Sequence, residues 1–387
     1  MQSLQPPEFV KTIISRLEAA GFEAYMVGGC VRDILMGRVP KDWDVTTSAR
    51  PEEIRSIFES TVPTGERHGT VTVIIDGNQA EVTAFRSESA YTDHRRPDAV
   101  TFVSDLAEDL ERRDFTINAI AMRTDGTLID YFGGKIDLEA GIIRCVGNAG
   151  ERFTEDALRM LRALRFCAEL GFEIEPLTFA ALKDCAPLSV HLSPERVRGE
   201  LCRILLSDRP ATIEKAFALG LMDNYVRPGE IVLVGLPLLP RRLEPRLCHL
   251  CINLLRSGQI KETTAFLSAL RFDKRTISLV SKAAALLLEG LPDTSGAMKR
   301  ALFKSGHDAV SLALQTSLDC ESLSLLESVA SSGDCFTLDC LAIKGDDLLS
   351  LGFRGKAVGE ALLFLLEHVI DNPDDNERNI LLNIIKY

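Results

Sequence analysis

The stretch from Ala24 to Thr47 (AYMVGGCVRDILMGRVPKDWDVTT) constrains this chain more than any other. It predicts a short strand, a glycine turn, a helix beginning at residues 31–35, a loop, and a second strand over residues 41–45. A helix start leaves backbone N–H groups free, and glycines let an anion approach them closely. The Gly28-Gly29 turn therefore predicts a phosphate site, and Arg32 in the following turn can add a charge-assisted contact to it.

A pair of carboxylates follows on the second strand. Successive side chains of a strand point to opposite faces, so Asp42 and Asp44 are expected on the same face. Two carboxylates held side by side repel each other, and a hard cation such as Mg²⁺ relieves this repulsion. A phosphate site beside a paired-carboxylate metal site indicates phosphoryl or nucleotidyl transfer with two metal ions.

Length and composition limit the class of protein. The chain has 387 residues, too many for one ordinary domain, and 46% of them are hydrophobic. A net charge of −12 argues against a generally basic nucleic-acid coat but allows a local basic surface for RNA. Ten dispersed cysteines indicate reduced thiols. We find neither a signal peptide nor an apolar run of about 18 residues, so a soluble, cytoplasmic protein is expected.

A hairpin and a third carboxylate come next. Residues 70–75 and 79–86 flank an Asp-Gly-Asn turn, which predicts two paired strands. Glu81 on the second strand is either a third active-site carboxylate or a solvent-facing residue, and the sequence leaves both open. Residues 87–100 are polar and charged, so we expect a mobile loop there. Helices are expected over residues 7–20 and 48–59.

The sequence LERRDFTINAIAM is a second polar block. A helix is expected over residues 105–111, and helical spacing continues over residues 115–121. Arg113 is a candidate ligand of a triphosphate. Asp114 and Asn118 are candidates for binding ribose hydroxyls, and contact with a 2′-OH distinguishes a ribonucleotide from a deoxyribonucleotide.

Residues 154–166 (TEDALRMLRALRF) predict one helix with Thr154 as its N-cap. Asp156, Arg159 and Arg162 would form one ridge, which Arg165 extends. Cytosine and adenine present an amino donor beside a ring-nitrogen acceptor, whereas guanine and uracil present the reverse pattern. A carboxylate beside a guanidinium could thus select C and A without a template, because mispaired polar edges are costly. A charge-laced surface helix shows the same spacing, so spacing alone leaves that alternative open.

Together these motifs resemble the nucleotidyltransferase superfamily that includes DNA polymerase β. More narrowly, they resemble the class II tRNA nucleotidyltransferases, which comprise CCA-adding enzymes and their poly(A) polymerase relatives. The resemblance rests on five ordered blocks: GGCVRD followed by DWD, RRDFTINA, LIDYFGGKIDLEAG, EDALRMLRALRF and LSPERVRGELCRILL. The last block ends at Leu206, and beyond it the chain shows only helical patterning.

The resemblance implies an α+β fold. An N-terminal nucleotidyltransferase head with a mixed or antiparallel sheet and helices would be followed by an all-α neck, body and tail. The paired glycines of the third block would form a hinge between the head and the rest. The expected boundaries are 1–140 for the catalytic head, 141–210 for the helical neck with the nucleotide-selecting helix, 211–290 for the body and 291–387 for a tRNA-binding tail.

The resemblance also implies the reaction. The expected activity is template-independent addition of the 3′-terminal CCA to tRNA from CTP and ATP, with pyrophosphate released and Mg²⁺ as cofactor. Asp42 and Asp44 would be the catalytic residues and would hold the metal. The partners would be the tRNA acceptor end, CTP and ATP, with no membrane; a homodimer is left open because some close relatives are dimers. The expected nucleotide-binding residues are Gly29, Arg32, Arg113, Asp156, Arg159, Arg162 and Arg165.

Several alternatives share these motifs. A CC-only or A-only adding enzyme and a poly(A) polymerase differ only in loop and tail detail, although the length of the loop over residues 87–100 favours an enzyme that adds the terminal A. An inactive RNA-binding scaffold is an alternative from another class, although it would have no need of a metal pair. Cys248 and Cys251 have zinc-like spacing, but no second pair follows, so we expect them to be packing residues.

Overall fold

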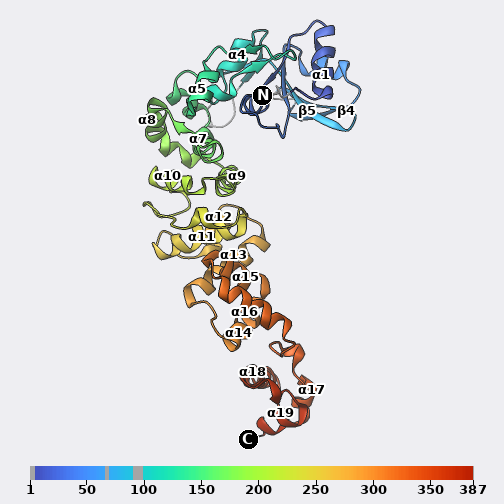
Figure 1. Cartoon of the computed structure of the whole chain (residues 1–387), viewed down its shortest axis with the longest axis vertical. Helices are drawn as coiled ribbons and strands as arrows, with labels where there is room; N and C mark the ends of the chain where they lie inside the picture. The colour runs from blue at the N-terminus through green and yellow to red at the C-terminus, as the bar shows by residue number, and fades with distance from the viewer. Residues whose placement is uncertain (1–4, 66–68, 90–98, 387) are drawn as a thin grey trace. The chain divides into compact units, whose positions relative to one another are not determined.

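The computed structural model describes residues 5–65, 69–89 and 99–386. The chain divides into two compact units (Figure 1). One contains residues 1–224 and 228–230, and the other contains residues 225–227 and 231–387. The first unit holds the sheet, whereas the described part of the second is built from helices without strands. This confirms the α+β class, and the four-domain division stays a prediction.

One mixed sheet forms the centre of the head. Its seven strands lie in the order β3-β4-β5-β2-β1-β8-β9, and β2 and β5 pair parallel while the other neighbours pair antiparallel. The central position of β1 explains why all four of its residues are buried. The strands are β1 (Ala24–Val27), β2 (Asp44–Thr47), β3 (Thr61–Gly65), β4 (Thr70–Ile75), β5 (Asn78–Ala84), β8 (Ala121–Met122) and β9 (Leu128–Ile129).

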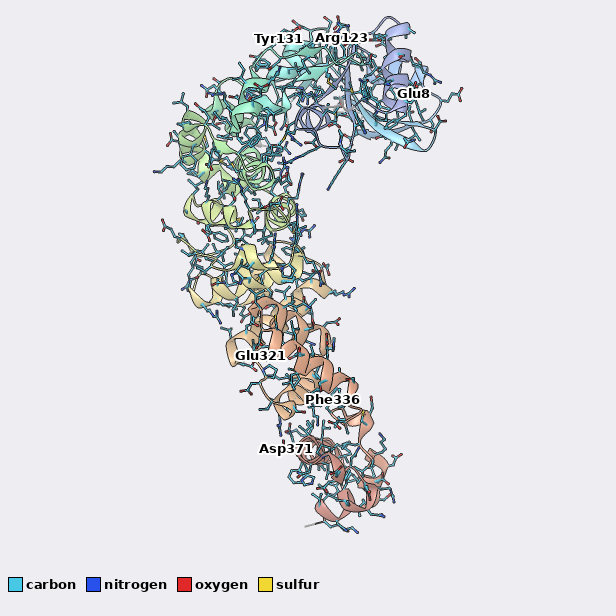
Figure 2. The ribbon with its side chains drawn as sticks, viewed as in Figure 1. Glu8, Arg123, Tyr131, Glu321, Phe336 and Asp371 are labelled. Carbon is cyan, nitrogen blue, oxygen red and sulfur yellow. The ribbon has the colours of Figure 1, made fainter. Side chains whose placement is uncertain are left out.

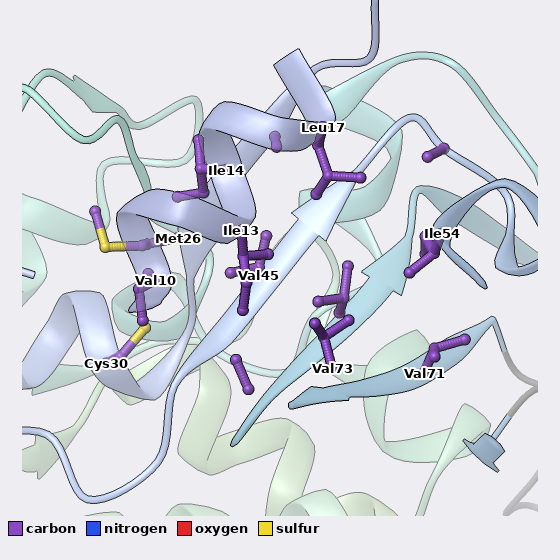
Figure 3. Packing of buried hydrophobic residues seen from close by; sticks show 14 of the residues in the cluster. Val10, Ile13, Ile14, Leu17, Met26, Cys30, Val45, Ile54, Val71 and Val73 are labelled. Carbon is purple, nitrogen blue, oxygen red and sulfur yellow. The ribbon is translucent and has the colours of Figure 1, made fainter. Parts of the chain in front are cut away.

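The core of the head lies between this sheet and its first helix, α1 (Glu8–Ala19). The helix buries residues spaced i, i+3, i+4 and i+7, the stripe of an amphipathic helix, which confirms the expected leading helix. Each fully buried aliphatic side chain contributes about 1.5–3 kcal/mol. Figure 3 shows the packing of Val10, Ile13, Ile14 and Leu17 with Met26, Val45, Val71 and Val73 of the sheet.

The predicted hairpin is confirmed. Strands β4 and β5 pair from Ile75 and Asn78 onward, so only Asp76 and Gly77 form the turn. Both turn residues have positive φ, 50° and 76°, as a two-residue hairpin of this kind requires. An Asp-Gly pair adopts this geometry readily, which is why the sequence signal was reliable.

Three expected elements differ in the structure. The helix expected over residues 48–59 is confined to α3 (Pro51–Ile57). The helix expected over residues 115–121 is wrong, because only a 3₁₀ turn, η2 (Thr116–Asn118), forms before β8. Part of the expected loop is instead a pair of antiparallel strands, β6 (Arg86–Ser89) and β7 (Ala99–Phe102), and residues 90–98 lie outside the described residues.

Phe115 explains the missing helix. Its backbone is extended, with φ −129° and ψ 149°, and it bridges to Cys145. Its N–H donates to the Asp114 carboxylate at 2.8 Å, so a side chain replaces the helical hydrogen bond. The remaining helices of this unit are α2 (Gly29–Leu35), α4 (Leu106–Glu111), α5 (Gly134–Ala140), α6 (Ala149–Glu155), α7 (Leu158–Leu170), α8 (Pro176–Cys185), α9 (Pro194–Leu205) and α10 (Ile213–Ala218).

The second unit is a series of packed helices. Cys248 and Cys251 are fully buried in the first of them and serve as core residues. Arg300 pairs with Glu367 and Asp371, which links α14 (Ser295–Ser305) to α18 (Lys356–Asp371). Figure 2 labels Asp371 among the side chains of this unit. No helix in the described part of the chain has the length and apolar character needed to cross a membrane. The helices are α11 (Leu243–Arg256), α12 (Thr263–Ala269), α13 (Lys274–Glu289), α14 (Ser295–Ser305), α15 (His307–Ser317), α16 (Cys320–Ser331), α17 (Gly345–Ser350), α18 (Lys356–Asp371) and α19 (Arg378–Ile384).

The glycine pair before α5 generates a stability prediction. A Cβ on Gly134 would lie 2.1 Å from the carbonyl oxygen of Thr116, whereas one on Gly133 would meet nothing within 4 Å. Gly133→Ala should cost about 1–2 kcal/mol, because φ there is positive. Gly134→Ala should cost about 3 kcal/mol or more, because the backbone of η2 must move. Urea unfolding of both variants tests this, and an equal loss in the two would contradict it.

Candidate active site

The turn between β1 and α2 places a cation and a carboxylate side by side. Gly28 has φ +76°, a region that residues with a side chain rarely adopt. A Cβ there would lie 3.2 Å from Nη1 of Arg113 and 3.7 Å from Oδ2 of Asp44. Glycine is thus required for backbone conformation, and its missing side chain lets Arg113 and Asp44 approach the turn.

The acidic residues gather differently from the sequence prediction. Strand β2 begins at Asp44, so Asp42 lies in the bend before it and the expected alternation along one strand is wrong. Asp44 is instead in register with Glu81 on the parallel strand β5. Burial raises the pKa of Asp44 to about 6; Arg113 opposes this shift, whereas Glu81 and Asp42 add to it. The three carboxylates therefore interact even though one is on a bend.

This cluster fits a divalent cation whose coordination a substrate completes. Among the described residues, no group of three or more His, Cys, Asp or Glu side chains is placed to hold a metal ion. Mg²⁺ usually takes one or two protein carboxylates and fills its other positions with water and substrate phosphates. The half-buried Asp44 carboxylate with its two exposed acidic neighbours supplies that incomplete set, because a cation would relieve their repulsion.

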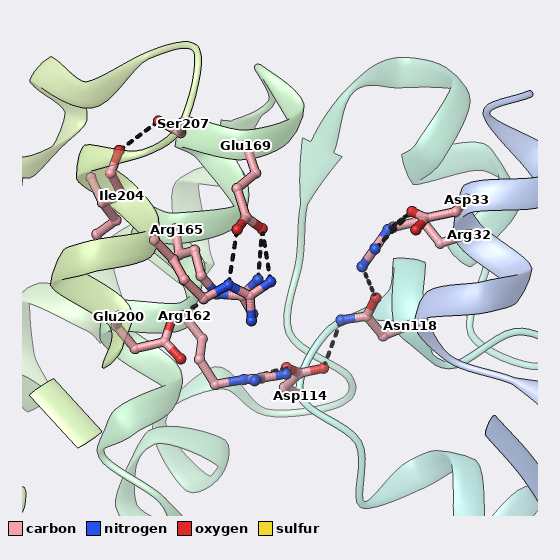
Figure 4. Close-up of polar contacts among 11 residues, drawn as sticks. Arg32, Asp33, Asp114, Asn118, Arg162, Arg165, Glu169, Glu200, Ile204 and Ser207 are labelled. Atoms are coloured by element: carbon pink, nitrogen blue, oxygen red, sulfur yellow. Dashed lines mark hydrogen bonds and ion pairs between the residues drawn. The ribbon is translucent and has the colours of Figure 1, made fainter. Parts of the chain in front are cut away.

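A chain of polar contacts extends from α2 to α7 (Figure 4). Arg32 donates from Nη1 to Asn118 at 2.8 Å, and Asn118 donates to Oδ1 of Asp114 at 3.1 Å. Arg162 donates from Nε to Oδ2 of Asp114 at 2.9 Å. Burial would raise the pKa of Asp114, but Arg162 and Asn118 outweigh burial and hold it well below its usual range. The ring of Phe166 lies 5.2 Å from the Arg32 guanidinium and 5.5 Å from that of Arg162. Three separate segments of the chain are thus connected through these contacts.

Asp156 interrupts the helix that the sequence predicted over residues 154–166. Helix α6 ends at Glu155, Asp156 is extended with φ −136° and ψ 101°, and α7 begins at Leu158. Its Oδ1 accepts the N–H of Leu158 at 3.0 Å, so Asp156 rather than Thr154 caps the second helix. Asp156 therefore does not continue a helical ridge through Arg159 and Arg162.

Asp156 has a partner that the sequence reasoning missed. Arg196 on α9 donates to both of its oxygens, at 3.0 Å and 2.7 Å, in a bidentate pair. Three donors therefore hold the Asp156 carboxylate in one orientation. Arg196 lies in the first turn of α9, in the fifth of the sequence blocks, but no local pattern connects it to a residue forty positions earlier.

The two remaining arginines occupy different environments. Arg159 donates to Glu155 at 2.6 Å and to the carbonyl of Arg112 at 2.8 Å, next to Arg113. Arg165 is only 2% exposed, and it pairs with Glu200 and Glu169. The expectation that Arg165 faces the triphosphate or RNA does not agree with this burial, and we assign it to packing.

Asp109 is another residue that the sequence reasoning missed. It is fully buried on α4 and accepts from Arg112 and Arg113. The signal was present, because a carboxylate three and four residues before two arginines is the spacing of helical ion pairs.

Asp44 generates a prediction about stability and pH. Its pKa in the folded protein is raised from 3.8 to about 6, so folding favours its protonated form. The protonated carboxyl therefore favours the folded state at low pH, and the free energy of unfolding falls as the pH rises through about 6. In chelator at neutral pH, Asp44→Asn should therefore be more stable than the parent, by up to about 3 kcal/mol. Urea unfolding between about pH 4.5 and 7.5 tests this, and a difference independent of pH would contradict it.

Comparison with known proteins gives the same picture over the whole chain. Residues 24–144 match the poly A polymerase head domain, and residues 171–228 match the probable RNA and SrmB-binding site of polymerase A. The CCA-adding enzyme of Lacticaseibacillus paracasei is 41% identical, with 98% of this chain and 97% of the relative covered. That of Leuconostoc mesenteroides is 53% identical over 58% of this chain and 56% of the relative.

A solved structure is similar over almost the same length. The crystal structure of the Bacillus stearothermophilus CCA-adding enzyme in complex with CTP matches with a TM-score of 0.80 and 33% identity. The match covers 99% of this chain and 98% of that one. Sequence and fold thus agree along the full length, and the chain belongs to the family of CCA-adding enzymes, nucleotidyltransferases whose head is shared with poly(A) polymerases.

Proposed function

We propose that this chain adds the 3′-terminal CCA to tRNA without a template, using CTP and ATP and releasing pyrophosphate. The observation that carries the proposal is the half-buried Asp44, set beside Glu81 and the Gly28 turn with Arg113 at the same point. A protein that only bound RNA would gain nothing from this costly charge arrangement. The relatives that span nearly the whole chain are CCA-adding enzymes, and one solved relative holds CTP.

The residues divide the work of nucleotidyl transfer. The Gly29 backbone, Arg32 and Arg113 bind the triphosphate and orient its α-phosphate toward the tRNA 3′-hydroxyl. Two Mg²⁺ ions held by Asp42 and Asp44 would supply positive charge that activates the hydroxyl and stabilises the leaving pyrophosphate. The ion pairs that hold these arginines exist before the substrate binds, so the site needs little reorganisation for the reaction.

The contacts of Asp156 support a role in choosing the base. A carboxylate has about four acceptor positions, and Arg196 and the Leu158 N–H use three of them. One position remains on Oδ2, which suits the single amino group on the pairing edge of C or A. Arg159 would exchange its contact with Glu155 for the ring nitrogen of that base. Arg162, which holds Asp114, would support the same pocket.

The same proposal extends to the rest of the chain. We propose that residues 1–140 are the catalytic head, that 141–210 form the neck, and that 211–290 and 291–387 form a body and a tRNA-binding tail. The full CCA activity is favoured over CC-only, A-only or poly(A) synthesis, because the relatives that match over nearly the full length are CCA-adding enzymes. The acceptor end of tRNA is the substrate to which these parts would bind.

Primer extension tests the reaction. Labelled tRNA transcripts ending before CCA, after C, or after CC should grow to CCA with CTP, ATP and Mg²⁺, and then stop. Asp42→Ala and Asp44→Ala should abolish extension, because metal binding is lost, while tRNA binding measured by gel shift remains. Arrest at CC, extension only of ends already bearing CC, or long A tails would each replace the proposed activity by a narrower one or by poly(A) synthesis. Retained tRNA binding without any extension would leave an RNA-binding scaffold.

Misincorporation tests the base-selecting residue. Asp156→Ala removes the acceptor for the amino group, and mispaired polar groups in such a site cost about 1–3 kcal/mol each. The preference for CTP and ATP over UTP and GTP should therefore fall by about tenfold or more. Single-nucleotide kcat/KM values give this ratio directly, with Glu169→Gln on the outer side of Arg165 as a control that should keep the parent selectivity. An unchanged ratio in the Asp156 variant would exclude the assignment.

A further inference from the structure

One buried charge in the head has no place in the reaction described so far. Asp109 on α4 is 0% exposed, although its helix is only six residues long and starts beside the surface. A buried carboxylate is unfavourable unless it is paired and hydrogen-bonded. The Asp109 carboxylate therefore needs hydrogen-bond partners inside the fold, and the same contacts hold those partners in place.

Those partners are two arginine guanidiniums and a threonine hydroxyl. Oδ1 accepts from Nε and Nη2 of Arg112, at 3.0 Å and 2.6 Å, and Oδ2 accepts from Nη2 of Arg113 at 3.2 Å. The hydroxyl of Thr46 also donates to Oδ2, at 3.0 Å. Thr46 lies on β2 two residues after Asp44, so Asp109 connects α4 to the strand that carries the half-buried catalytic carboxylate.

The two arginines that Asp109 binds contact different parts of the proposed nucleotide site. Nη2 of Arg113 is bound to Asp109, which leaves Nη1 at the Gly28 turn beside Asp44. The backbone carbonyl of Arg112 accepts a hydrogen bond from Arg159 at 2.8 Å. The triphosphate-binding and base-reading arginines are thus tied to consecutive residues that share one buried anchor.

The electrostatics agree with an anchor that stays ionised. Burial alone would raise the pKa of Asp109, but Arg112 and Arg113 outweigh burial and hold it below its ordinary value. An ionised carboxylate accepts from both guanidiniums and from Thr46 at once. An amide of the same shape has only one acceptor oxygen and would turn two N–H donors toward the arginines.

We propose that Asp109 is a positioning residue for the nucleotidyl-transfer reaction, which holds Arg113 against the triphosphate. This inference rests on the proposed function for its substrate. Asp109 does not touch the nucleotide in this arrangement. It acts by fixing the direction of a guanidinium whose other face binds phosphate.

Nucleotide binding by the full-length chain separates positioning from general stability. Asp109→Asn should weaken CTP binding by about 10- to 100-fold, the value of a charge-assisted contact, while cytidine, which lacks phosphates, binds as to the parent. Asp137→Asn is the matched control, because Asp137 is also buried and holds an arginine and a threonine, Arg144 and Thr116. It should lose stability with its ratio of CTP to cytidine affinity unchanged.

A double-mutant cycle tests the route of the effect. If Asp109 acts through Arg113, Asp109→Asn combined with Arg113→Ala should bind CTP no more weakly than Arg113→Ala alone. Additive losses would overturn the inference, as would an Asp109→Asn variant with the parent's ratio of CTP to cytidine affinity. Thr46→Val removes one donor to the same oxygen without changing side-chain shape, and it replaces Asp109→Asn if that variant does not fold. A few-fold loss for CTP alone supports the inference, and equal losses for CTP and cytidine overturn it.

These experiments distinguish failure of the proposed function from failure of the positioning role of Asp109. If the parent chain binds CTP but extends no tRNA, the proposed function is wrong, whereas the effect of Asp109 on triphosphate binding is still measured. If the parent extends tRNA and Asp109→Asn leaves triphosphate affinity unchanged, the positioning role is wrong and the function stands.

Discussion

The proposed nucleotide site depends on the ion pair between Asp114 and Arg162. Asp114 lies just before η2 in the head, and Arg162 lies on α7, which follows the sheet in the chain. Asp114 is buried and Arg162 is half-buried, so removing Arg162 would leave a buried carboxylate without its main compensating charge. Asn118 and then Arg32 are bound through the same carboxylate. One interaction therefore sets how the turn after β1 and the helix after Asp156 face each other.

Other charged residues of the proposed site are also held in place by ion pairs. Asp109 holds Arg113, and Arg196 holds Asp156, so the groups proposed to contact the nucleotide are oriented by charges behind them. Donors that are ordered before the substrate arrives stabilise developing charge without reorganisation. Asp44 is the exception, because Asp42 and Glu81 add to the effect of its burial rather than relieve it. Arg113 opposes that effect only in part, and the remaining negative charge would favour a cation at this point of the head.

Local sequence patterns predicted many secondary-structure elements of the head but few of the contacts between distant residues. The strand, glycine turn and helix after Ala24 and the Asp76-Gly77 hairpin were readable, because each is determined by neighbouring residues. The sequence left open whether Glu81 joins Asp44 and missed the pairing of Asp156 with Arg196, because contacts between distant segments leave no periodic trace. Arg165 was misassigned for the same reason: its helical spacing matches a surface ridge, and only tertiary packing shows that Glu200 encloses it.

The break at Asp156 shows why helical spacing did not predict the surroundings of this residue. In a continuous helix the side chain of residue 156 would lie on the surface of a turn, free to change rotamer and exposed to water. Because its own carboxylate caps Leu158, the residue leaves helical geometry, and Arg196 can then approach both oxygens. A recognition group must present its remaining acceptor in one direction, since a mobile carboxylate would accept from any donor. Loss of the helical ridge therefore gives Asp156 the fixed direction that its proposed role in base selection requires.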